Sequence, residues 1–90
     1  MKAFLICYDL NKSGQYYKNL LECIKGYDYV KVMQSTYVVL SNESATEIRE
    51  KCKAQCDTND FFFVTRFDDT DWCAYCSKTV VDWLNKNCRK

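Results

Sequence analysis

Apolar residues fall into seven stretches along the chain, and their spacing predicts alternating strands and helices. Residues 2–9 are apolar at both odd and even positions, which is typical of a strand covered on both faces. Three further stretches are rich in β-branched and aromatic side chains, as strands are. The remaining three carry apolar residues at helical spacing. Strands are therefore expected at 2–9, 28–33, 35–41 and 61–67, and helices at 15–25, 44–56 and 72–87.

This order, β-α-β-β-α-β-α, predicts one α+β domain over residues 1–90. Its first six elements match the ferredoxin-like βαββαβ sandwich, with a four-stranded antiparallel sheet over 1–67. A helical extension would follow over 70–90. The helices are expected to cover one sheet face and to leave the other open. An open apolar face of that size usually marks an interface, so we expect a homodimer formed through sheet faces or edges.

Local signals refine three of these elements. Ser44 and Glu47 form a capping box that begins the second helix, and Glu47 also stands four residues before Lys51, a favourable spacing for an ion pair. Gly26 is placed to end the first helix. A tight hairpin between the second and third strands would normally contain Gly or Asn. Gln34-Ser35 offers neither, so we expect a bulge or a bend there.

Charge and composition narrow the chemistry. The chain has 13 basic and 12 acidic residues, a net charge of +1, which lacks the basic excess of tight nonspecific nucleic-acid binders. It contains no His, which excludes every mechanism that needs an imidazole base or ligand. No apolar run is long enough to span a membrane. The N-terminal residues show no signal peptide, so we expect a cytoplasmic protein with reduced thiols.

The chain has seven cysteines, an odd number that cannot all pair within one molecule. Four occupy apolar positions of the expected strands and helices, where small buried side chains fit: Cys7, Cys23, Cys52 and Cys56. A zinc site built from Cys52, Cys56, Cys73 and Cys76 would lack a knuckle turn, so no zinc is expected. A redox role for Cys73 and Cys76 lacks the preceding thioredoxin-like pattern.

Two segments carry a family resemblance. Tyr8-Asp9-Leu10 ends the first strand, and Lys31-Val32-Met33-Gln34-Ser35-Thr36-Tyr37-Val38-Val39-Leu40 covers the hairpin. Together they resemble the small CRISPR-associated nucleases that form the second subunit of the spacer-integration complex. The chain is similar, more closely, to short stand-alone SinR-like proteins akin to virulence-associated protein D toxins.

The resemblance implies a ferredoxin-like homodimer in which Asp9 of each protomer lies near the two-fold axis. It also implies that the two carboxylates hold Mg²⁺ and that the protein is an endonuclease acting on RNA or DNA, in antiviral defence or as a toxin. CRISPR members usually carry basic residues after Tyr-Asp, whereas Asn11-Lys12-Ser13-Gly14 supplies one Lys here. One alternative is a non-catalytic dimeric scaffold for a nucleic-acid or protein partner. A third possibility is a protein that binds a small nucleotide in the dimer cleft.

Four residues are candidates for the site. Asp9 is the catalytic and metal-binding candidate, although a strand-end Asp also commonly accepts hydrogen bonds from the following turn. Ser35 matches the Ser of the family motif, and Asn11 follows Asp9 closely. Arg66 is the charged residue of the fourth strand. It is expected either to contact phosphate or to pair with a nearby carboxylate.

Overall fold

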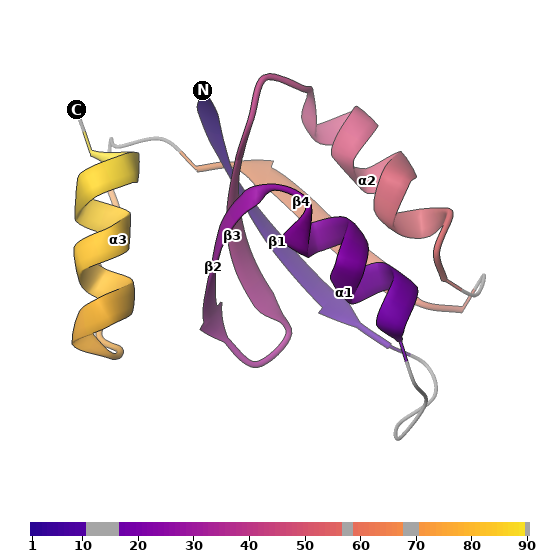
Figure 1. Cartoon of the computed structure of the whole chain (residues 1–90), viewed down its shortest axis with the longest axis horizontal. Helices are drawn as coiled ribbons and strands as arrows, with labels where there is room; N and C mark the ends of the chain where they lie inside the picture. Colours follow the sequence, from indigo (N-terminus) through magenta and orange to yellow (C-terminus); the bar gives the residue numbers. More distant parts are fainter. Residues whose placement is uncertain (11–16, 57–58, 68–70, 90) are drawn as a thin grey trace.

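The computed structural model describes residues 1–10, 17–56, 59–67 and 71–89 (Figure 1). Its elements are β1 (Lys2–Asp9), α1 (Lys18–Lys25), β2 (Asp28–Met33), β3 (Thr36–Ser41), α2 (Ala45–Lys53), β4 (Phe61–Arg66) and α3 (Lys78–Cys88). The strands form one antiparallel sheet in the order β2-β3-β1-β4. The predicted fold, a ferredoxin-like βαββαβ sandwich with an additional C-terminal helix, is confirmed. None of the described helices is long and apolar enough to cross a membrane.

β1 is the inner strand that joins the two halves of the sheet. It pairs with β3 on one side and with β4 on the other, so Ile6 stands opposite both Tyr37 and Val64. Phe4 and Ile6 are buried beneath α1 and α2, while Ala3 is buried on the opposite face. The prediction that β1 is apolar on both sides because both sides are covered is therefore confirmed for residues 3–6.

α1 and α2 cover one face of the sheet and form its larger core. Leu20 and Ile24 of α1 and Ile48 of α2 are fully buried there against the strands. Ala45, Ile48 and Cys52, which follow helical spacing in the sequence of α2, belong to this cluster, and so does Cys56 just after the helix. The helical spacing in the sequence thus identified which side of each helix faces the sheet.

α3 packs against the other face, which corrects the expectation that all helices would lie on one side. Figure 1 shows it on the far side of the sheet from α1 and α2. Leu84 and Cys88 of α3 are buried against Val38 and Leu40 of β3 and Ala3 of β1. The reason is that these strands also carry apolar side chains on their second face, and α3 covers part of that face.

α3 begins at Lys78, six residues later than the helical spacing predicted. The side chain of Ser77 caps it by accepting a hydrogen bond from the Val80 backbone N–H at 3.4 Å. Before that, Trp72 packs against Phe67 with ring centroids 5.3 Å apart, and the Arg89 guanidinium lies 3.8 Å from its ring centre. The segment around Trp72 therefore follows the sheet instead of starting the helix.

The ends of α1 and α2 agree with most of the local signals. Ser44 and Glu47 form the predicted capping box with both hydrogen bonds present. Lys51, however, pairs with Glu43 and not with Glu47, because the Glu47 carboxylate is engaged at the cap. α1 does end before Gly26, but Gly26 has φ −73° and so does not use the left-handed conformation expected of a terminating glycine.

The β2–β3 hairpin closes with two residues, Gln34 and Ser35, although neither is Gly or Asn. Ser35 adopts φ 61°, the left-handed conformation that glycine tolerates best. The expected irregularity is also present, since the register shifts by one residue between Lys31 and Met33. The bulge and the strained serine together replace the turn residues that the sequence lacks.

We expect Ser35→Gly to raise the free energy of unfolding by roughly 0.5–1 kcal/mol, because it removes the cost of a positive φ at a residue with a Cβ. Gln34→Gly is the matched control. Gln34 lies in the same turn but has no positive φ. A glycine there should lower the free energy of unfolding by about 0.5–1 kcal/mol, because it increases the conformational entropy of the unfolded chain. Urea denaturation of both variants measures the difference, and a loss of stability in both would contradict the explanation.

Candidate functional site

Asp9 is the last residue of β1, and its side chain is exposed. In the register with β4 it stands opposite Phe61, while the neighbouring Tyr8 stands opposite Phe62 and packs towards α1. Successive residues of a strand point to opposite faces, so Asp9 shares the sheet face of Cys7 and Leu5, on the side where α3 lies. No side-chain hydrogen bond or ion pair joins the Asp9 carboxylate to another described residue.

Ser35 lies at the same end of the sheet as Asp9. The Tyr8 backbone N–H donates a hydrogen bond of 3.1 Å to the Ser35 carbonyl, which ties the hairpin turn to the end of β1. The side chain of Ser35 lies on the α1 side with Tyr8, beside a cavity. The structure therefore brings Ser35 next to the residue before Asp9, but on the opposite face of the sheet.

Arg66 lies away from these residues. It pairs with Phe4, at the other end of β1 from Asp9. Asp9 is five positions after Phe4, which corresponds to about 17 Å along an extended strand. Arg66 and Asp9 also face opposite sides of the sheet, so one phosphate could not contact both in one protomer. Asn11, the remaining candidate, lies outside the described residues.

Asp9 borders an apolar surface that α3 leaves uncovered. We call this surface the open face and define it by three residues with large exposed side chains: Phe61 (68% exposed), Phe63 (63%) and Met33 (60%). Phe63 stands opposite Cys7 in the register, as Phe61 stands opposite Asp9. Exposed phenylalanines on one face of an edge strand are unfavourable in water, which is why such a surface usually contacts a partner.

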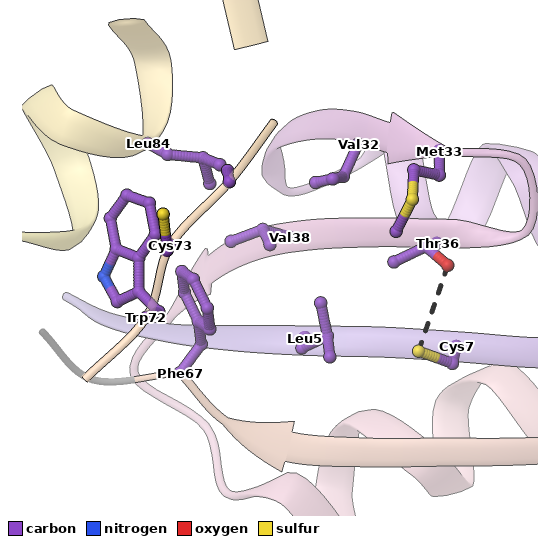
Figure 2. Close-up of a pocket in the computed structure, with 11 residues that line it drawn as sticks. Leu5, Cys7, Val32, Met33, Thr36, Val38, Phe67, Trp72, Cys73 and Leu84 are labelled. Carbon is purple, nitrogen blue, oxygen red and sulfur yellow. Dashed lines mark hydrogen bonds between the residues drawn. The ribbon is translucent and has the colours of Figure 1, made fainter. Parts of the chain in front are cut away.

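The open face continues into a cavity of about 190 Å³ between the sheet and the segment that leads to α3. Figure 2 shows Leu5 and Val38 on its floor, with Leu84 and Trp72 at the end nearest α3. Its polar atoms are few. At the other end the Thr36 hydroxyl lies 4.0 Å from the Cys7 sulfur, as a weak hydrogen bond. The cavity therefore extends the apolar surface rather than forming a site for a charged substrate.

All seven cysteines are free thiols. Burial raises the pKa of the Cys52 thiol to about 12 and that of Cys88 to about 11, so both stay protonated and unreactive near neutral pH. Cys73 and Cys76 precede α3 instead of lying on it, and Cys73 is exposed at the cavity of Figure 2. Among the described residues, no three side chains of the types that bind metals come together.

The sequence predicted an open apolar sheet face, but it did not identify the exposed residues of that face or the cavity beside Ser35. Phe61 and Phe63 alternate in the sequence of β4, but their exposure depends on which part of this sheet face α3 covers. The cavity needs Lys31 to stand opposite Tyr37, a register that the two-residue turn sets. The predicted bulge left that register undetermined.

The fold and the site define a ferredoxin-like protein with an exposed strand-end carboxylate at the border of an open apolar face. Comparison with models of known protein families finds none that matches the chain, and no curated protein matches it. The family resemblance carried by Tyr8-Asp9-Leu10 therefore stays a prediction.

We expect Cys73 in the native protein to react with iodoacetamide at least about 10-fold faster than Cys52 or Cys88, because a buried thiol with a raised pKa supplies little thiolate. Peptide mapping by mass spectrometry at mildly alkaline pH gives the rate for each residue. The same reaction in urea is the control and should make the rates similar. Equal rates in the native protein would contradict the burial of Cys52 and Cys88.

Proposed function

We propose that this protein is a homodimeric, metal-dependent endonuclease acting on RNA or DNA, with Asp9 of both protomers at the dimer axis. The observation that carries the proposal is the position of Asp9, exposed and without a described partner at the border of the open face. In a two-fold interface a residue lies near its own copy only where it is close to the axis, so the proposal requires the axis to pass beside Asp9.

The dimer is supported by the exposed side chains of the open face. Phe61 and Phe63 project from β4, which is an edge strand of the sheet. Stable interfaces bury about 800 Å² on each partner and have an apolar centre. Two aromatic side chains with Met33 and the adjoining cavity supply such a centre on each protomer. Pairing through this face would also cover the exposed edge of β4.

The metal is supported by the chemistry of the carboxylate. Mg²⁺ prefers oxygen ligands and retains several waters, so it needs few protein groups. The described part of one protomer does not gather three metal-binding side chains, and the proposal takes a second carboxylate from the Asp9 of the other protomer. When bound, Mg²⁺ would polarise the phosphate and lower the pKa of a water.

The residues of the chain would contribute position and environment. The two Asp9 carboxylates would hold the metal, and Phe61, opposite Asp9, would shield one side of the site from water. Asn11, which follows Asp9 by two residues in the sequence, is proposed to bind the substrate. Ser35 and Arg66 lie on the other sheet face from Asp9 in the same protomer. If they bind the substrate, the substrate must be long enough to reach beyond the metal site.

The alternative function is a dimeric scaffold without catalysis, which would hold a nucleic-acid or protein partner. The observation in its favour is that no three metal-binding side chains come together among the described residues. Both functions need the dimer, and they differ in whether Asp9 takes part in chemistry. The location of either is proposed to be the cytoplasm.

We expect the wild-type protein to be a dimer in light scattering, at twice the chain mass of 10.7 kDa. The double variant Phe61→Lys/Phe63→Lys should be a monomer, because it would bury two unpaired charges at the centre of the interface. Tyr75→Lys is the control, since Tyr75 is fully exposed outside the open face. A monomeric wild type, or a dimeric double variant, would refute the interface.

We expect wild-type protein to cleave single-stranded RNA or DNA in the presence of Mg²⁺ or Mn²⁺, and Asp9→Asn to lower the rate about 100-fold or more through loss of the metal ligand. The matched control is Asp28→Asn, which neutralises an exposed Asp at the start of β2, at the other end of the sheet. If the wild-type dimer leaves both substrates intact, the catalytic role fails and the scaffold is the remaining function.

A further inference from the structure

A second cavity, of about 310 Å³, lies on the opposite face of the sheet from Asp9, where β1 ends beneath α1. The rings of Tyr8 and Tyr37 line one side of this cavity. Tyr17, the residue just before α1, also lines it. We call it the tyrosine pocket. The side chains of Lys31, Gln34 and Ser35 also line it, all from the β2–β3 hairpin. Neither the open face nor Asp9 belongs to it.

The fold builds this pocket through the register of the hairpin. Lys31 stands directly opposite Tyr37, so both side chains point to the α1 side. The strained conformation of Ser35 closes the turn within two residues, and the Ser35 carbonyl is held by the Tyr8 backbone N–H at 3.1 Å. The polar end of the hairpin is thereby fixed against the aromatic end of β1.

The polar groups around the tyrosine pocket are mostly hydrogen-bond donors. Lys31 contributes an ammonium group that makes no ion pair with the described part of the chain, and Gln34 contributes an amide. The Ser35 hydroxyl can also donate. Burial beside Tyr37 raises the pKa of the Tyr8 phenol, which keeps it protonated. The described lining residues include no carboxylate, so the pocket favours an anion such as a phosphate.

The remaining surface of the pocket suits a flat ring. Tyr8 and Tyr37 lie with ring centroids 6.3 Å apart and planes 20° apart, and Leu10 and Leu21 add apolar surface. Aromatic and apolar side chains of this kind bind bases by stacking, without regard to sequence. A volume of about 310 Å³ is at the lower end of ligand pockets, which limits the ligand to about one nucleotide.

We propose that the tyrosine pocket binds a single nucleotide, with its phosphate at Lys31, Gln34 and Ser35 and its base against the tyrosine rings. The nucleotide is either free or part of a single strand, since the recognised groups are the same in both. Binding does not require cleavage at Asp9 or the dimer, because the pocket is formed within one protomer on the other face of the sheet.

The experiment titrates the ¹⁵N-labelled protein with AMP, GMP, CMP and UMP, with inorganic phosphate, and with a short single-stranded oligonucleotide lacking a terminal phosphate. We expect the backbone amides of Lys31, Gln34 and Ser35 to shift with a nucleotide. Shifts with mononucleotides identify a free ligand, and shifts with the oligonucleotide alone identify a strand. No shift of these amides with either probe overturns the proposal, as does phosphate binding as tightly as every nucleotide.

Two variants test the contacts. Lys31→Ala should weaken nucleotide binding at least about 10-fold, because it removes the charged partner of the phosphate. Lys86→Ala is the matched control, since it removes an exposed Lys from α3 and should bind as the wild type does. Gln34→Ala serves as a second pocket variant, and the amide spectrum reports whether each variant is folded. Unchanged affinity in both pocket variants would overturn the proposal, whatever the outcome at Asp9.

Discussion

The pairing of β1 with both β3 and β4 is the constraint on which the rest of the structure depends. Because β1 is an inner strand, each of its side chains is directed into one of two layers. Phe4 and Ile6 join the core under α1 and α2, and Ala3 joins the smaller core under α3. The same alternation sends Tyr8 and Asp9 to opposite faces at the end of the strand. It therefore separates the two candidate sites, although they are neighbours in the sequence.

The two faces of the sheet are covered unequally, and the inequality positions the proposed dimer. α1 and α2 bury one face under a continuous core, whereas α3 covers part of the other near Val38 and Leu40. Phe61 and Phe63 of β4 stay exposed beside Asp9. The residues before α3 are not helical, and the Trp72 ring among them packs against Phe67 and Arg89. α3 starts only at Lys78 and leaves the open face uncovered.

The hairpin between β2 and β3 illustrates how a locally unfavourable residue can serve a pocket. Ser35 has a positive φ that glycine would adopt at less cost. Its turn nevertheless brings Lys31 opposite Tyr37 and places its own carbonyl on the backbone of Tyr8. A serine at this position keeps a hydroxyl at the pocket, which glycine would not supply. Strain at a site that also carries polar groups is consistent with a role in binding.

The sequence by itself determined the order of elements, the ferredoxin-like class, the capping box at Ser44 and the inward side of α2. These follow from local spacing, because helix and strand periodicities and caps are set by residues close along the chain. It also singled out Asp9 as a strand-end acid. Only the tertiary structure decided that α3 crosses to the second face and that Arg66 lies far from Asp9. It alone decided that Lys31 meets Tyr37, since these positions depend on register and on packing between distant segments.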